Sequence, residues 1–204
     1  MENVDDEVRD AEEQKENLKY TERMARFDEL TGVKNQKAFT EETRIMNIKI
    51  KSHMEAPVFG VVMCDVNDLK RINDTRGHSF GDEAIQRTSR MICEVYKHSP
   101  VFRIGGDEFA VILTSSDFAQ REALLQRLKE ESLANQRSRS GPVVACGMAV
   151  YDPDTDNEFS DVFERADNLM YENKKDLKTG YAVEGFCFTY SICKIIVRSF
   201  CYVI

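Results

Sequence analysis

Residues 101–113 read VFRIGGDEFAVIL, and this stretch decides the fold of the chain around it. Two runs of apolar and β-favouring residues, 101–104 and 109–113, flank the tetrapeptide Gly105-Gly106-Asp107-Glu108. This composition predicts a β-hairpin with a tight tip. Glycines accept positive φ and let another molecule approach the backbone, and carboxylates are hard oxygen ligands for a divalent cation. The tetrapeptide also suits an ordinary solvated turn, so the hairpin alone leaves both interpretations open.

Apolar patterning on both sides of the hairpin predicts further strands. Residues 58–66 (VFGVVMCDV) form an almost continuous apolar run, typical of a strand covered on both faces, and the run carries Asp65 near its end. Residues 142–151 (PVVACGMAVY) read as another strand, in which Gly147 indicates a bulge or a close approach of another segment.

Helical spacing of apolar residues predicts four helices. One follows the capping residue Asn35 with Phe39, Ile45, Met46 and Ile50 on its apolar side, and a second begins at Gly81-Asp82. The other two cover residues 117–134 and 160–178, the last with Leu169 among its inward positions. Helices interleaved with strands predict a layered α/β domain over residues 28–180, with helices packed on a central sheet.

The two ends of the chain differ in character from this domain. Residues 1–27 are highly charged and place Val4, Ala11, Leu18 and Ala25 on one heptad position, which fits a helical connector with a weak coiled coil or a solvated leading helix. Residues 181–204 turn abruptly apolar and suit either a terminal strand or hairpin or a non-native terminus.

Composition narrows the class of protein. The chain has 204 residues with 42% hydrophobic and 31% charged residues, the range of a globular protein. The net charge of −8 argues against broad nucleic-acid binding or direct contact with an anionic membrane, because both need a basic face. Six scattered cysteines and an acidic N-terminus without signal-peptide features favour a cytoplasmic location.

Carboxylates from separate strands form the candidate catalytic centre. A sheet could bring the end of the strand that carries Asp65 next to the hairpin tip with Asp107 and Glu108. Such an oxygen-only site selects Mg²⁺ or Mn²⁺ over zinc, and two such ions could clamp an in-line phosphoryl or nucleotidyl transfer. Taken alone, however, Asp65 also suits a simple turn at the end of a strand.

Residues 66–84 (VNDLKRINDTRGHSFGDEA) are dense in polar groups of complementary kinds. Lys70 could neutralise phosphate charge, and the backbone amides of residues 67–69 could hold phosphate oxygens. Asn73 and Asp82 together offer the donor and acceptor that guanine requires. The alternative is separate capping and turn duty for these two residues, with Asp82 at the start of a helix.

The segments DELTGVKNQKAF, CDVNDLKRINDTRGHSFGDEA, FRIGGDEFAVIL and ADNLMYENKK, in this order, resemble the GGDEF family of diguanylate cyclases. The resemblance implies a mainly antiparallel sheet wrapped by helices, similar to the palm of adenylyl cyclases and polymerases. It also implies that each domain binds one GTP and that two domains meet, so that each 3′-hydroxyl attacks the partner's α-phosphate. The products are then cyclic di-GMP and two pyrophosphates, and a homodimer is required.

The resemblance also implies roles for single residues. The implied metal ligands are Asp65, the carbonyl of Val66, Asp107 and Glu108. The implied catalytic residues are Asp107, Glu108, as a ligand or in activating the 3′-hydroxyl, and Lys70. The implied substrate contacts are Asn73 and Asp82 for guanine, the loop amides of Asn67, Asp68 and Leu69, the close-approach glycines Gly105 and Gly106, and Lys174 and Lys178 for the terminal phosphates. The implied cofactor is Mg²⁺ or Mn²⁺, two ions per site.

Two departures from the family pattern stand out. The Arg-x-x-Asp of the product-inhibition site is replaced by Tyr96-Lys97-His98-Ser99, which predicts no high-affinity feedback site. Lys178 stands where arginine is common and lacks the bidentate fork of a guanidinium group. A rival interpretation is therefore a catalytically silent module that binds GTP or a partner. An upstream sensor domain, absent from these residues, is a further expected partner.

Overall fold

The computed structural model describes residues 9, 21, 25–52 and 57–179. The predicted apolar tail lies outside the described residues, as does most of the predicted connector, of which Arg9 and Thr21 have helical backbone conformation. Among the described helices, none is both long and apolar enough to cross a membrane.

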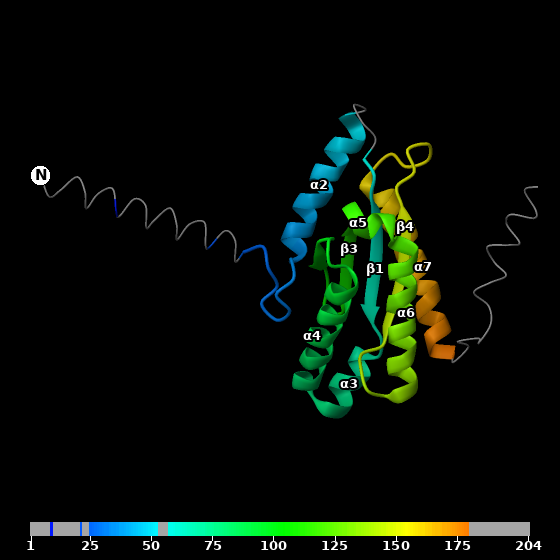
Figure 1. Cartoon of the computed structure of the whole chain (residues 1–204). Coiled ribbons are helices and arrows are strands. Elements are labelled where there is room, and N and C mark those ends of the chain that lie inside the picture. The colour runs from blue at the N-terminus through cyan, green and yellow to red at the C-terminus, as the bar shows by residue number, and fades with distance from the viewer. Residues whose placement is uncertain (1–8, 10–20, 22–24, 53–56, 180–204) are drawn as a thin grey trace, which may run out of the picture.

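The centre of the domain is an antiparallel sheet of four strands in the order β2-β3-β1-β4 (Figure 1). The strands are β1 (Gly60–Val66), β2 (Val101–Arg103), β3 (Glu108–Leu113) and β4 (Val144–Val150). β2 and β3 form the predicted hairpin around residues 104–107, and β1 pairs with both β3 and β4. The prediction of a mainly antiparallel central sheet wrapped by helices is confirmed.

Helices cover both faces of this sheet, which explains why β1 is buried along its whole length. α4 (His78–Val95) and α6 (Arg121–Ser138) pack on the face that carries Val62 and Cys64. α2 (Gln36–Ser52) and α7 (Phe159–Thr179) pack on the face that carries Val61 and Met63. The side chains of a strand alternate between the two faces of the sheet, and here both faces are buried under helices.

Gly147 in β4 is a point of close approach between the sheet and α7, as predicted. A Cβ atom at this position would lie 2.1 Å from the backbone N of Met170 and 2.5 Å from the carbonyl O of Ala166. The backbone of α7 therefore rests directly on β4. This contact sets the position of the last turns of α7, which carry Lys174 and Lys178.

Several predicted helix boundaries were wrong. α3 (Leu69–Arg76) was missed, because its only buried residue is Leu69 and a helix with so little apolar surface shows no period. α4 begins at His78 rather than Gly81, since its first turn is exposed. The helix expected over 117–134 is two helices, α5 (Ser115–Ala119) and α6, separated at Gln120.

Two apolar positions that were predicted to face inward are partly exposed instead. Ile45 on α2 is 38% exposed and Leu169 on α7 is 45% exposed. On α2, by contrast, Met46 and Ile50 are buried as expected, and Asn35 caps the helix by accepting a hydrogen bond from the backbone N of Ala38 at 3.0 Å. The helical spacing of apolar residues therefore located both helices correctly, but the buried face of each helix is narrower than that spacing predicted.

Candidate active site

The register of β1 against β3 brings together the carboxylates that were predicted to lie together. Asp65 is the direct cross-strand partner of Glu108, so their side chains leave the same face of the sheet. One residue further, the backbone N of Val66 donates a hydrogen bond to the carbonyl O of Asp107 at 3.0 Å. Asp65 and Glu108, 43 positions apart in sequence, are thus held side by side by the backbone ladder (108 − 65 = 43).

Burial and mutual repulsion raise the pKa of both paired carboxyl groups. For Asp65, burial raises the pKa most and the charge of Asp107 adds to it, while Lys174 acts in the opposite direction. For Glu108, burial again comes first, followed by the charges of Asp107 and Asp65. Lys174 Nζ lies 2.6 Å from Asp65 Oδ1, so this lysine is placed against a carboxylate as well as beside the cavity described below.

The donor set of this site fits a hard divalent cation. The side chains of Asp65, Asp107 and Glu108 and the carbonyl of Val66 supply oxygen only, which suits Mg²⁺ or Mn²⁺. A cation would also relieve the repulsion that raises the two pKa values. Within the described residues, no three Asp, Glu, His or Cys side chains are grouped closely enough to hold a metal ion by themselves.

A cavity of about 410 Å³ adjoins these carboxylates and is rich in charged groups. Asp107 lines it together with Val66, Asp68, Leu69, Lys70, Arg71, Asp74, Lys174 and Lys178. Asp68 has a left-handed backbone (φ 60°) and precedes the first residue of α3, so the loop turns sharply there. The free amides at the start of a helix favour an anion, so the cavity combines lysine charge with backbone donors.

The two residues predicted to read guanine come from adjacent helices. Asn73 on α3 packs against Gly81 on α4, the residue before Asp82. Asn73 Oδ1 is buried and has no hydrogen-bond partner within the described part of the chain. Asp82 is exposed in the second turn of α4, whose cap position is Gly77, so the alternative that Asp82 starts the helix is wrong. Neither residue lines the 410 Å³ cavity.

Comparison with known proteins identifies the family. The sequence profile described as "Diguanylate cyclase, GGDEF domain" matches residues 25–179. The chain belongs to the GGDEF family. The chain is 28% identical over 165 residues to the probable diguanylate cyclase DgcT of Escherichia coli, covering 78% of this chain and 35% of that protein. It is 29% identical over 157 residues to the cyclic di-GMP phosphodiesterase NbdA of Pseudomonas aeruginosa, covering 74% and 19%.

A solved structure supports the same assignment for this GGDEF domain. The coiled coil and GGDEF domain of DgcB from Caulobacter crescentus, in complex with c-di-GMP, superposes with a TM-score of 0.70 at 26% identity. The match covers 84% of this chain and 92% of that one. The chain spans only about a third of DgcT and a fifth of NbdA, so both relatives contain much that this chain does not match.

If Asn73 reads guanine as the family resemblance implies, replacing Gly81 with alanine should weaken GTP binding by moving Asn73. The added Cβ would lie 1.9 Å from Asn73 Oδ1, so the amide of Asn73 must rotate away from Gly81. We expect KM for GTP to rise about tenfold, the cost of one hydrogen bond to the base. Helix α4 itself is preserved, because alanine favours helix more than glycine. Ser79→Ala, at an exposed position of the first turn of α4, is the control, and an unchanged KM in Gly81→Ala contradicts the role of Asn73.

Arg103 and Asp28 form a brace behind the hairpin tip that the sequence reasoning missed. Arg103 Nη1 donates to both carboxylate oxygens of Asp28 at 3.1 Å, and Arg103 Nη2 donates to the carbonyl O of Gly106 at 2.8 Å. The start of the domain is thereby tied to the tip that carries Asp107. Both residues lie inside the segments that resemble the GGDEF family, so the sequence marked each of them. It gave no indication that they pair with each other across 75 positions (103 − 28 = 75).

Arg103→Gln should lower both stability and turnover. Burial alone would raise the pKa of Asp28, but hydrogen bonds from Thr31 and Arg103 outweigh it and lower the pKa from its ordinary 3.8. A carboxylate whose pKa is lowered in the folded state stabilises the fold at pH values above its unfolded-state pKa. This stabilisation is lost as the pH falls through the folded-state pKa. We expect a loss of about 2 kcal/mol at neutral pH that shrinks in acid, and a fall in kcat of about tenfold from a misplaced tip.

The Arg103→Gln measurement combines urea unfolding at neutral and acidic pH with GTP turnover. Arg90→Gln, an exposed arginine of α4, controls for the loss of charge. An equal loss of stability at both pH values would show that the ion pair with Asp28 is not responsible.

Proposed function

We propose that this domain is a diguanylate cyclase that condenses two GTP into cyclic di-GMP and two pyrophosphates. The observation that carries the proposal is the cross-strand pairing of Asp65 with Glu108, next to Asp107 and the lysine-lined cavity. In this proposal Asp65, the Val66 carbonyl and the hairpin carboxylates hold Mg²⁺ or Mn²⁺, which would supply charge neutralisation at the α-phosphate. The loop amides of residues 67–69, Lys70, Lys174 and Lys178 bind the phosphates, and Asn73 and Asp82 read guanine.

The proposed reaction requires two copies of the domain. Each copy provides one hairpin tip and one nucleotide site, so the 3′-hydroxyl that attacks must come from the GTP of a second copy. Gly106 leaves room for that approach, because a Cβ atom there would meet no atom within 4 Å among the described residues, whereas a Cβ atom at Gly105 would lie 2.6 Å from Glu108 Oε2. Specific activity should therefore rise with protein concentration before it reaches a plateau.

The experiment is turnover of GTP with Mg²⁺ across a range of protein concentrations. Cyclic di-GMP and pyrophosphate are quantified together, and ATP replaces GTP as the control for base recognition. We expect product from GTP only, with specific activity that depends on concentration. An absence of cyclic dinucleotide at the highest protein concentration would falsify the proposal.

A second candidate is a silent module that binds GTP without turning it over. NbdA, which the chain matches over part of its length, is named for cyclic di-GMP hydrolysis. Lys178 also supplies a point charge where a guanidinium fork is common. GTP binding without product, together with a monomer in sedimentation in the presence of nucleotide, would favour this candidate.

We predict that cyclic di-GMP does not bind tightly at the surface of residues 96–99. Tyr96 is 1% exposed at the end of α4, and Ser99 Oγ accepts a hydrogen bond from the backbone N of Thr114 at 3.2 Å. Neither residue presents the guanidinium or carboxylate needed for that contact. Calorimetry should detect no sub-micromolar site, and a tight site that Lys97→Ala and His98→Ala weaken would contradict this prediction.

A further inference from the structure

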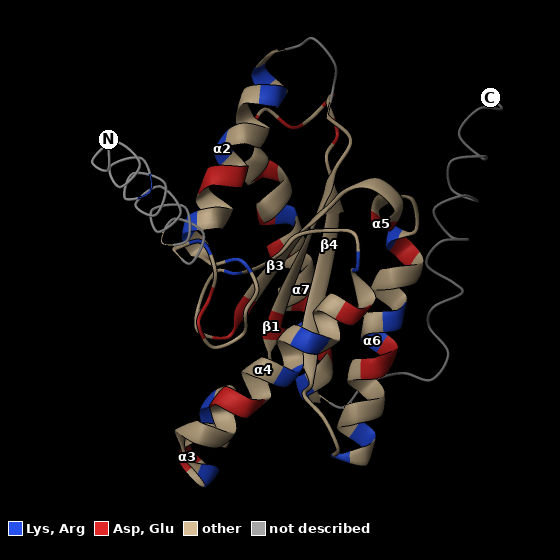
Figure 2. Cartoon of the chain, turned by 60° about the vertical axis from the view of Figure 1, so that its left-hand side comes forward, with Lys and Arg blue, Asp and Glu red and all other residues tan. Residues whose placement is uncertain are grey.

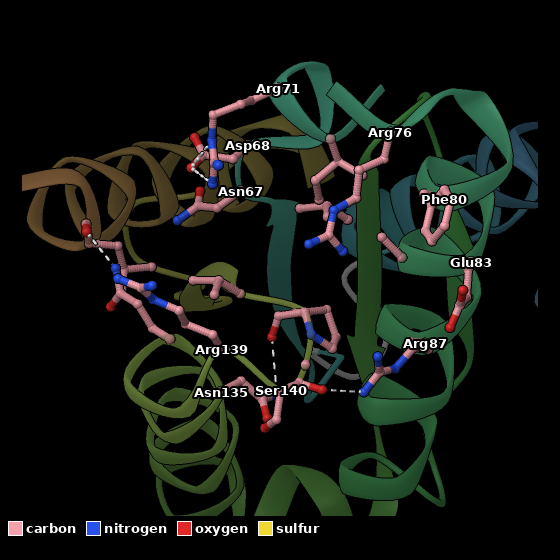
Figure 3. Close-up of a pocket in the computed structure, with 18 of the residues that line it drawn as sticks. Asn67, Asp68, Arg71, Arg76, Phe80, Glu83, Arg87, Asn135, Arg139 and Ser140 are labelled. Atoms are coloured by element: carbon pink, nitrogen blue, oxygen red, sulfur yellow. Dashed lines mark hydrogen bonds and ion pairs between the residues drawn. The ribbon is translucent and has the colours of Figure 1, made fainter. Parts of the chain in front are cut away.

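A second, larger cavity lies on the other side of the α3–α4 pair from the proposed guanine site. Its volume is about 990 Å³, and α3, α4, the loop after α6 and the end of α7 enclose it (Figure 3). On α4, the lining residues Phe80, Ala84 and Arg87 share one face of the helix. Asp82 lies about 200° around the helix axis from Phe80, so it is on a different face from the one that lines this cavity. We call this cavity the arginine pocket.

The arginine pocket carries an excess of positive charge in an acidic protein. Five cationic side chains line it, against the two carboxylates Asp68 and Glu83; the cations are Arg71, Arg76, Arg87, Arg139 and Lys178. Figure 2 shows Lys and Arg segments on α3, on α4 and at the end of α6. Arg71 pairs with Asp68 at 3.0 Å, but both side chains are exposed and such pairs are weak.

The remaining cations leave this charge largely unneutralised. Within the described part of the chain, Arg76, Arg139 and Lys178 have no carboxylate within 4.0 Å. Figure 3 shows Arg76 reaching into the space between the helices. The pocket therefore attracts an anion with several charges, because more than one cation can approach it at once.

The wall formed by the loop after α6 is held in place by hydrogen bonds. Arg87 Nη2 on α4 donates to the carbonyl O of Ser140 at 2.6 Å, and Asn135 Nδ2 on α6 donates to the carbonyl O of Pro142 at 3.1 Å (Figure 3). These bonds connect α4, α6 and the loop across the cavity. The pocket is thus preformed, which lowers the ordering cost of binding.

Arg139 occupies a backbone conformation that normally favours glycine. It follows α6 with φ 55° and ψ 30°, the left-handed region, where a side chain is disfavoured. A left-handed residue often ends a helix and is usually glycine, so glycine here would relieve the strain while it removes the guanidinium from the rim of the cavity. Binding and stability should therefore respond in opposite directions when this side chain is removed.

One end of the pocket presents an aromatic platform. Phe80 is 47% exposed, and the guanidinium carbon of Arg76 lies 5.8 Å from its ring centroid. An exposed aromatic ring next to an arginine is the arrangement on which a planar base stacks. The volume is within the range of small-molecule sites and accommodates one nucleotide.

We propose that the arginine pocket binds a phosphorylated nucleoside, with its base stacked on Phe80 and its phosphates held by Arg76, Arg139 and Lys178. Lys178, Arg71 and Asp68 also line the 410 Å³ cavity, so the two sites share a wall. If the proposed function holds, a nucleotide in the arginine pocket draws Lys178 away from the terminal phosphate of GTP. Occupancy then raises KM for GTP without entering the guanine site.

The test is binding of ADP to the whole chain in the presence of EDTA, measured by calorimetry. ADP keeps a purine ring and two phosphates but lacks the base edge that Asn73 and Asp82 would read, and EDTA removes the cation that the carboxylate site requires. We expect one site per chain. Arg139→Gly should weaken it about tenfold, the value of one charge-assisted contact, while the melting temperature stays equal or rises.

Matched variants distinguish binding in the arginine pocket from binding in the 410 Å³ cavity and from general effects of charge. Arg137→Gln removes an exposed arginine in the last turn of α6 that does not line the pocket and should leave ADP affinity unchanged. Glu83→Gln removes a carboxylate from the lining and should tighten binding. Phe80→Ala should weaken ADP but leave binding of inorganic pyrophosphate unchanged.

Several outcomes would overturn the proposal. They are the absence of ADP binding at millimolar concentration, equal affinity in Arg139→Gly and Arg137→Gln, or a loss of pyrophosphate and ADP binding to the same extent in Phe80→Ala. The measurement involves no GTP turnover. A chain that binds ADP in this way but makes no cyclic dinucleotide supports the pocket and refutes only the proposed function.

Discussion

Asp107→Ala should reduce cyclic di-GMP formation by at least about a thousandfold while the protein remains folded, because in the proposed function Asp107 holds the metal ion beside the reacting phosphate. Asp107 lies at the hairpin tip and lines the 410 Å³ cavity. Its contribution to the fold is the carbonyl O that accepts the hydrogen bond from Val66, and alanine keeps that carbonyl. Its side chain is only partly buried, so little packing is lost.

The Asp107→Ala measurement pairs product formation with the melting temperature. Asp176→Asn changes an exposed carboxylate of α7 that does not line this cavity and should keep full activity. We expect the melting temperature of Asp107→Ala to stay within about 2 °C of the unmodified protein. Activity that survives in Asp107→Ala would mean that the hairpin does not hold the catalytic cation.

Gly147→Ala should destabilise the domain by about 3 kcal/mol, the upper range for overpacking a core. The new Cβ would overlap the backbone of α7, at 2.1 Å from Met170 N and 2.5 Å from the carbonyl carbon of Leu169. Backbone atoms of a packed helix cannot rotate away as a side chain can. The helix must shift as a unit, and Lys174 and Lys178 shift with it, so turnover falls as well.

The Gly147→Ala measurement is thermal unfolding, and we expect a fall of roughly 6–12 °C for a domain of this size. Gly106→Ala is the matched control, because a Cβ at Gly106 would meet no atom within 4 Å among the described residues. Its melting temperature should not change. If Gly147→Ala melts like the control, α7 does not contact β4 at this position.

Features set by local sequence were predicted well. The hairpin around Gly105 and Gly106, the buried strand that carries Asp65 and the cap at Asn35 all depend on a few neighbouring residues, although neither hairpin glycine adopts the positive φ that glycine allows. Contacts over long sequence separations were predicted only in outline, and helical segments without a hydrophobic period were not predicted at all. The α3 helix was missed because its polar sequence carries no period, and the extra first turn of α4 was missed for the same reason.

The sequence by itself determined the chemistry available to this protein: two acidic residues at a glycine-rich tip, Asp65 near the end of a buried strand, and the motifs of the GGDEF family. Only the tertiary structure decided which of these groups meet. Strand register set Asp65 against Glu108, and helix packing set Lys174 against Asp65 and Asn73 against Gly81. The brace from Arg103 to Asp28 and the arginine pocket arise in the same way, because such contacts follow from how elements pack rather than from any local pattern.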